Sequence, residues 1–292
     1  MRAQHVRLRD MADWNKITSR GSVEDRRAMS PVGLGGGLGI GGVVLLILFN
    51  YLGGGSVTDV LPQVLNQLEN TQVVQQNIDT SQFEGADSYE VFASTVLGST
   101  NDMWANLFGA NNKTYTPPKL VLFRTATESA CGGATSNVGP HYCPLDQTIY
   151  LDETFFDELT KRFGASGGDV AQAYVIAHEV AHHAQHELGI LAADGSVSNA
   201  GSLTEQQQSI DLELQADCFA GLWAYSIKNK GVFLPNEISE ALDAASAVGD
   251  DRIQQKTEGR ITPETWTHGS SEERVRWFTA GYDTGSLASC NT

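Results

Sequence analysis

The sequence predicts an α+β protein in which a single-pass N-terminal membrane anchor precedes one mainly helical domain with a small β-sheet. The 292 residues are enough for one sizeable domain with a buried core. An uncharged apolar run comes first, followed by a helix, short strands and several longer helices. We therefore divide the chain into a basic N-terminal segment (1–31), a transmembrane helix (32–55), a spacer (56–88) and a folded domain (89–292).

The anchor prediction rests on "VGLGGGLGIGGVVLLILFNYLGGG", residues 32–55, which contain no charged side chain. About 20 apolar residues cross a bilayer as a helix, and glycine is more frequent in membrane helices than in soluble ones. The alternatives are a signal-peptide core and a buried glycine-rich helix. The leading segment of about 30 residues is long for a signal peptide, and no clear A-x-A cleavage site follows. We therefore expect an uncleaved anchor.

The charge distribution predicts the orientation of this anchor and excludes one class of partner. Lys16, Arg20, Arg26 and Arg27 lie shortly before the run, so the positive-inside rule places the N-terminus in the cytoplasm and residues 56–292 outside it. The whole chain has a formal net charge of −16. An acidic domain repels nucleic acid, which we exclude as a partner.

The chain contains 4 cysteines: Cys131, Cys143, Cys218 and Cys290. An even number fits disulfide formation outside the cytoplasm, although the sequence alone allows several pairings. The short Gly-rich loop between Cys131 and Cys143 favours a local bridge, which would leave Cys218 to pair with Cys290. A zinc cluster is the competing interpretation, but no C-x-x-C pair supports it.

Hydrophobic periodicity and turn residues predict the secondary structure of the domain. A helix at 88–108 precedes strands at 119–124 and 147–152. The longer helices are expected at about 169–188, 203–228, 236–249 and 270–282. The second of these begins at a predicted Ser202-x-x-Glu205 capping box, and serines and acids precede the last.

The helix at 169–188 carries the strongest chemical signal, "AHEVAHHAQH". His178 and His182 lie four residues apart and therefore on one helix face, where both imidazoles can bind one zinc ion. Glu179 would face the open coordination position and act as the general base for a water molecule. Apolar neighbours place this helix in the interior of the domain.

The third zinc ligand has to come from another helix. Gln185 and Leu188 stand where an extended single-helix motif would need glycine and histidine. In "ELQADCFAG", Glu213 and Asp217 are again four residues apart. We predict Glu213 as the third ligand and Asp217 as a carboxylate that orients a ligand histidine. The alternative is a pair of solvated acids.

Together these motifs resemble the bacterial putative neutral zinc metallopeptidase family. The resemblance rests on "HEVAHHAQHELG", "ELQADCFAG", "HGSSEERVRWFTAG", "GPHYCPLDQTIYLD" and "SVEDRR", and covers nearly the whole chain. The E-x-x-A-D pattern is also similar to that of gluzincin proteases. The resemblance implies a zincin-like domain in which His178, His182 and Glu213 bind Zn²⁺ and Glu179 is the general base.

A similar His followed by Arg lies near the active site of gluzincin membrane proteases. The resemblance therefore implies that His268 donates a hydrogen bond to the oxyanion and that Arg274 pairs with Asp217 or with another acid near the ligands. The alternative for His268 is a turn or cap residue. His183 and His186 are expected on the helix surface, and His141 in a loop without chemistry.

The predicted function is a membrane-anchored extracytoplasmic zinc metalloprotease that hydrolyses peptide bonds. Its substrate would be a peptide or protein, bound by addition to a sheet edge for which residues 147–152 are the candidate strand; the alternative is an internal strand. The competing functions are a catalytically silent zinc-binding scaffold or assembly protein of the cell envelope, and a metal hydrolase acting on glycan or lipid.

Overall fold

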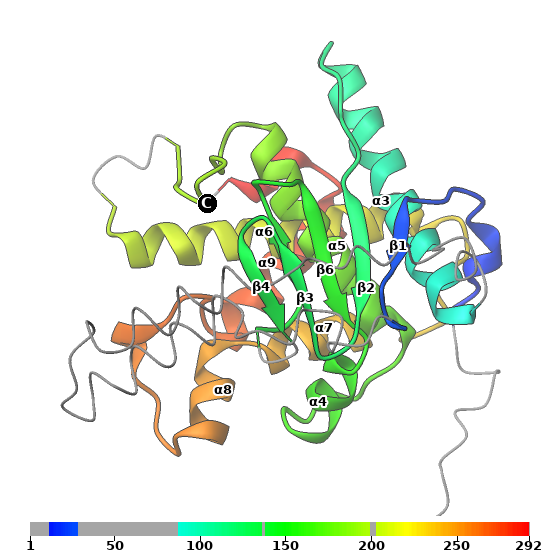
Figure 1. The fold of residues 1–292 in the computed structure, drawn as a ribbon. Coiled ribbons are helices and arrows are strands. Elements are labelled where there is room, and N and C mark those ends of the chain that lie inside the picture. The colour runs from blue at the N-terminus through cyan, green and yellow to red at the C-terminus, as the bar shows by residue number, and fades with distance from the viewer. Residues whose placement is uncertain (1–11, 29–86, 136–137, 199–202, 292) are drawn as a thin grey trace, which may run out of the picture.

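The computed structural model describes residues 12–28, 87–135, 138–198 and 203–291 (Figure 1). The predicted anchor at 32–55 and nearly all of the predicted spacer lie outside these residues. Within the part of the chain that is described, no helix has the length and apolar character needed to cross a membrane. The described residues form a mainly helical α+β domain with a small mixed sheet.

The main sheet has four strands in the order β1-β2-β6-β5. They are β1 (Val23–Asp25), β2 (Lys119–Phe123), β6 (Thr148–Asp152) and β5 (His141–Cys143). The first three are parallel, and β5 is antiparallel to β6. A separate hairpin consists of β3 (Ala126–Ser129) and β4 (Gly132–Thr135).

Two features of this sheet differ from the sequence prediction. The strand predicted at 147–152 as an edge is internal, because β6 pairs with β2 on one side and β5 on the other. All five residues of β6 are accordingly buried. In addition, residues 12–28 pack against the domain through β1, although the sequence had assigned them to a separate N-terminal segment.

The helices lie behind, beside and below the main sheet in the view of Figure 1. They are α3 (Ser88–Ala110), α4 (Phe155–Lys161), α5 (Asp169–Glu187), α6 (Glu205–Lys228), α7 (Ile238–Ala247), α8 (Asp250–Thr257) and α9 (Ser271–Thr284). The single helix predicted at 236–249 is thus too long by two residues at each end, and a further helix, α8, begins directly after it. The short helix α4 was not predicted.

Local capping explains where two functional helices begin. At α6 the N-cap is Thr204, whose hydroxyl accepts the backbone N–H of Gln207 at 3.1 Å. The helix therefore begins after Thr204 and not at the predicted capping box, whose Ser202 lies outside the described residues. A full capping box instead starts α9, where Ser270 and Glu273 bond each other's backbone N–H groups.

Most buried apolar residues form one core between the sheet and helices α3, α5, α6, α7 and α9. Most of α5 is buried, as the apolar residues around its histidines predicted. The structure contains the disulfides Cys131–Cys143 and Cys218–Cys290, the pairs that the sequence favoured. The second links α6 to the segment that follows α9.

Candidate metal centre

Three predicted ligands converge between α5 and α6. One ligand atom each from His178, His182 and Glu213 lies within 4.8 Å of the others. The Nε2 atom of His178 is 3.2 Å from one carboxylate oxygen of Glu213, and that of His182 is 3.4 Å from the other. Two imidazole nitrogens and a carboxylate are a donor set of catalytic zinc sites, and they leave a fourth position open.

The ionisation of these groups is set by burial and by one another. Burial lowers the pKa of His178, but hydrogen bonds to Asp217 and Glu213 outweigh it and raise the pKa to about 10. Burial raises the pKa of Glu213, but His182 and His178 hold it well below its usual value. A divalent cation would compete with protons for these same nitrogen and oxygen atoms.

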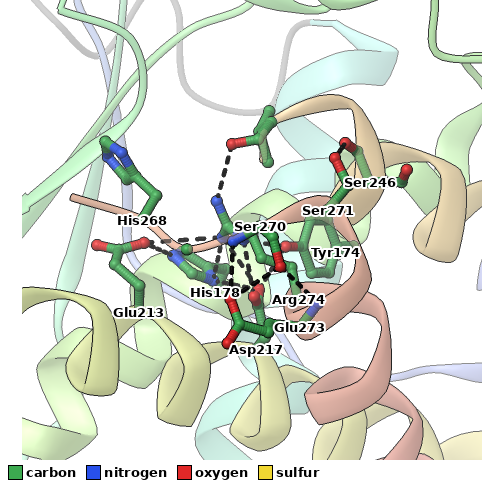
Figure 2. A network of polar contacts seen from close by, with 12 residues as sticks. Tyr174, His178, Glu213, Asp217, Ser246, His268, Ser270, Ser271, Glu273 and Arg274 are labelled. Atoms are coloured by element: carbon green, nitrogen blue, oxygen red, sulfur yellow. Dashed lines mark hydrogen bonds and ion pairs between the residues drawn. The ribbon is translucent and has the colours of Figure 1, made fainter. Parts of the chain in front are cut away.

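Asp217 fixes the orientation of the first ligand histidine (Figure 2). Its carboxylate is fully buried and lies 3.0 Å from Nδ1 of His178, which must donate the hydrogen bond. With Nδ1 bound to Asp217, Nε2 of His178 is the nitrogen that would bind a metal once its proton is displaced. The hydroxyl of Tyr174 donates to the same carboxylate. Tyr174 was not predicted, although it lies one helical turn before His178 on the same face.

Arg274 on α9 neutralises Asp217. Its Nε donates to Oδ2 of Asp217 at 2.8 Å and its Nη2 to Oδ1 at 3.1 Å, which is the bidentate geometry of a strong ion pair. The guanidinium is also 3.7 Å from the carboxylate of Glu213. Burial opposes ionisation of Asp217, but Arg274 and His178 lower its pKa below the usual value. The predicted pairing of Arg274 with Asp217 is therefore present in the structure.

Two glycines allow α9 to approach α6 closely enough for this pair. A Cβ atom on Gly221 would collide with the carbonyl oxygen of Phe278, and one on Gly281 would collide with that of Cys218. The helix backbones are therefore in direct contact beside the disulfide-bonded Cys218. This contact sets the position of Arg274 over Asp217.

Gln185 orients the second ligand histidine. Its amide nitrogen donates to the carbonyl oxygen of Leu212 at 2.8 Å and to Gln215 at 3.1 Å, so its oxygen faces Nδ1 of His182 at 2.9 Å. His182 therefore donates through Nδ1 and presents Nε2 to the centre. Contact of Gln185 with a ligand histidine was not predicted. A polar residue three positions after a ligand was the available signal.

A cavity of about 630 Å³ opens beside the three ligands. Glu179 lines it together with His178 and His182, as the motif spacing predicted. The remaining wall is largely apolar and is contributed by β5, α4, α5 and the α7–α8 region: it includes Val138, Pro140, Phe155, Phe163, Leu191, Val248 and Ile253. The centre thus borders a space large enough for part of an extended peptide.

His268 also lines this cavity, on the loop before α9. Its Nδ1 is 3.2 Å from Asp250 and 2.8 Å from the hydroxyl of Thr267. The other oxygen of Asp250 accepts the backbone N–H groups of Thr267, His268 and Gly269 at 2.7, 2.6 and 3.1 Å. Asp250, which was not predicted, therefore holds the whole loop in place.

His183 and His141 differ from expectation. His183, predicted on the surface of α5, is fully buried, where Nδ1 accepts from Tyr142 at 3.0 Å and Nε2 donates to the carbonyl of Thr116 at 2.6 Å. Burial lowers its pKa, so it stays neutral and ties α5 to β5. His186 is half-buried against the carbonyl of Leu191. His141 belongs to β5 and lines the cavity.

Comparison with known proteins agrees with this donor set. A family model described as "Putative neutral zinc metallopeptidase" matches residues 12–292. "Uncharacterized protein YpfJ" of Escherichia coli strain K12 is 41% identical over 289 residues, 96% of this chain and 98% of its own length. "Uncharacterized protein Rv2575" of Mycobacterium tuberculosis strain H37Rv is 43% identical over 247 residues, 78% and 81% of the two chains. No solved structure matches the chain.

Proposed function

Because the chain belongs to the putative neutral zinc metallopeptidase family, we propose that it is a zinc-dependent peptidase acting at the His178, His182 and Glu213 centre. The observation that carries this proposal is the convergence of two Nε2 atoms and one carboxylate beside a cavity that Glu179 also lines. Bound zinc would supply Lewis acidity, which lowers the pKa of water and polarises a peptide carbonyl.

Glu179 acts as the general base and acid in this proposal. Its carboxylate takes the proton of the attacking water and passes it to the leaving amine. Asp217 and Gln185 hold the Nδ1–H groups of the two ligand histidines, so that both rings keep their orientation during the reaction. Arg274 keeps Asp217 ionised in the protein interior.

His268 is proposed to stabilise the oxyanion that forms on the attacked carbonyl. It lines the same cavity as the ligands, and its Nδ1 is directed toward Asp250, so Nε2 is the nitrogen available to substrate. Asp250 keeps that orientation through the loop backbone. Loss of His268 should therefore lower the rate of cleavage more than it changes zinc content.

The proposed substrate is an extended peptide. Its backbone would pair with β5, the terminal strand of the sheet beside the cavity, and its side chains would contact the apolar cavity wall. An extracytoplasmic location remains part of the proposal and is supported by the two disulfides. Membrane attachment through residues 32–55 remains a prediction.

The deciding experiment measures zinc content and cleavage of an unstructured protein with the full chain and three variants. Glu179→Gln should retain about one zinc per chain and lose activity about 100-fold or more. Glu213→Ala should lose zinc. Glu158→Gln is the matched control, because Glu158 lies at the same cavity but is half exposed and pairs with Arg162.

Undiminished cleavage by Glu179→Gln would refute the assigned mechanism. Stoichiometric zinc without cleavage of any peptide or protein would favour the scaffold, and cleavage of glycan or lipid alone would favour the third candidate. A folded chain that binds no zinc would overturn the ligand assignment.

A further inference from the structure

Residues 12–28 form part of the domain that carries the metal centre. Strand β1 pairs with β2 in parallel, with Val23, Glu24 and Asp25 opposite Leu120, Val121 and Leu122. The backbone N–H of Leu120 donates to Ser22 at 3.0 Å, and that of Arg26 donates to Leu122 at 2.7 Å. This pairing extends the main sheet, so the segment completes the domain rather than resting on its surface.

The part of the segment before β1 contacts the two helices that carry the metal ligands. The backbone N–H of Ala12 and the indole of Trp14 both donate to Asp169, the first residue of α5. The Trp14 ring stacks on Trp223 of α6 with centroids 6.3 Å apart. Ile17 is 2% exposed and belongs to the main core.

Two glycines show how closely the segment fits α3. A Cβ atom on Gly21 would collide with the side chain of Leu97, and a Cβ on Gly98 would meet the backbone of Arg20. Gly21 and Ser94 also exchange two hydrogen bonds at 2.7 and 2.8 Å. The close packing depends on the absence of a side chain at both Gly21 and Gly98, which indicates a specific interface between the segment and α3.

A buried ion-pair cluster holds the end of the segment. The Arg27 side chain is 6% exposed and lies 2.7 Å from each of Asp25, Asp87 and Glu153. Asp25 first, and then Glu153, outweigh burial and raise the pKa of Arg27. Asp87 caps α3, so Arg27 and Asp87, which flank the stretch containing residues 32–55, meet at one point.

We propose that residues 12–28 and 87–291 lie on the same side of the membrane. This placement excludes a single membrane crossing between them, which is what a single-pass anchor at 32–55 would require. The hydrocarbon core of a bilayer is about 30 Å thick, whereas the Arg27–Asp87 ion pair measures 2.7 Å. A single crossing at 32–55 would also place β1 and β2 in different compartments. Residues 56–86 include Asp59, Glu69, Asp79 and Glu84 and no second long apolar run.

The same contacts weaken the positive-inside argument, which placed the N-terminus in the cytoplasm and the domain outside it. The positive-inside prediction counted Arg26 and Arg27 among free cytoplasmic charges. In the structure Arg26 donates to Glu24 and Thr127, and Arg27 binds Glu153. Lys16 donates to the carbonyl of Gly231. These cations are therefore partners of the metal domain and no longer indicate the cytoplasm.

Single cysteines in the full-length protein test the proposal. All 4 natural cysteines are in disulfides, so an introduced one is the free thiol. Thr18→Cys and Thr114→Cys are both at exposed positions, one on each side of the run. A membrane-impermeant maleimide is applied to intact cells and to permeabilised cells. Either both variants should be labelled in intact cells, or both should be labelled only after permeabilisation. Labelling of one in intact cells and the other only after permeabilisation would overturn the proposal.

A second measurement tests the contact itself in membranes. The hydroxyl of Ser19 bonds the carboxylate of Asp102 on α3. In a Ser19→Cys/Asp102→Cys double variant, mild oxidation should form a third disulfide and remove both thiols from maleimide labelling. The Thr18→Cys/Lys161→Cys pair is the control, because Lys161 is exposed and pairs with Asp157 of its own helix, α4. Persistence of both free thiols at 19 and 102 would contradict the docking that the proposal requires.

Discussion

Two buried arginines, Arg274 and Arg27, each join parts of the chain that are far apart in sequence, but their partners differ in exposure. Arg274 is 4% exposed and its partner Asp217 is completely buried. Arg27 is 6% exposed, but its partners range from Asp25 at 9% to Asp87 at 48%. Water can therefore replace part of the Arg27 contacts and none of the contact between Arg274 and Asp217. The first pair should position the candidate metal centre, whereas the second cluster should hold residues 12–28 against the domain.

Removing Arg274 should have the largest effect. In Arg274→Ala, Asp217 stays buried without its cation, which costs about 3–5 kcal/mol of unfolding free energy. Because Asp217 also orients His178, zinc affinity should fall about 10–100-fold. Thermal unfolding and a zinc competition titration measure the two effects. Unchanged zinc affinity in a folded Arg274→Ala variant would show that Asp217 needs no arginine to hold the histidine.

Removing Arg27 should cost less, about 1–3 kcal/mol, because solvent reaches Asp87 and Glu153. Zinc affinity and cleavage should stay unchanged, while limited proteolysis within residues 12–28 should become faster. Arg20→Ala is the control, since among the described residues the Arg20 guanidinium donates to carbonyls of its own segment, at Ile17 and Ser19. Loss of zinc in Arg27→Ala would remove the distinction between the two arginines.

The smallest effect should come from Glu240. It lies near Asp169, the acid to which Ala12 and Trp14 of the N-terminal segment donate hydrogen bonds. Burial first, and then the nearby Asp169, raise the pKa of Glu240 to about 7. A carboxyl with a raised folded-state pKa stabilises the fold below its unfolded pKa of about 4.3 and loses that contribution as pH rises toward 7. Glu240→Gln should therefore raise the melting temperature at pH 8 by a few degrees relative to the parent and have less effect at pH 5.

Thermal unfolding of Glu240→Gln at the two pH values tests this sign, with the exposed Glu258→Gln as control. The contribution should be below about 1 kcal/mol, because Glu240 is only half-buried and solvent screens the charges. An equal shift at both pH values would mean that the titration of Glu240 does not govern the effect.

The helical part of the candidate centre could be predicted from sequence because helix geometry is local. Spacing of four residues put His178 with His182 and Glu213 with Asp217 on common faces, and the structure brings all four together. Asp250 could not be found this way, because its role lies in backbone N–H groups of a loop 17 to 19 residues away. Such contacts leave no periodic pattern.

The sheet was harder to predict for a related reason. Strand β6 was located correctly. Whether it lies at an edge depends on its neighbouring strands, and the sequence of one strand does not identify its pairing partners. Strand β1 has three half-buried residues that show no apolar alternation. A short parallel strand paired almost 100 residues along the chain therefore escaped notice.

The position of α9 in the chain order has a consequence for biosynthesis. The ribosome makes α5 and α6 before α9, so a nascent chain already contains His178, His182 and Glu213 before Arg274 has been added. Until α9 packs against Gly221 and neutralises Asp217, His178 lacks its final support. Stable zinc loading should therefore follow synthesis of α9.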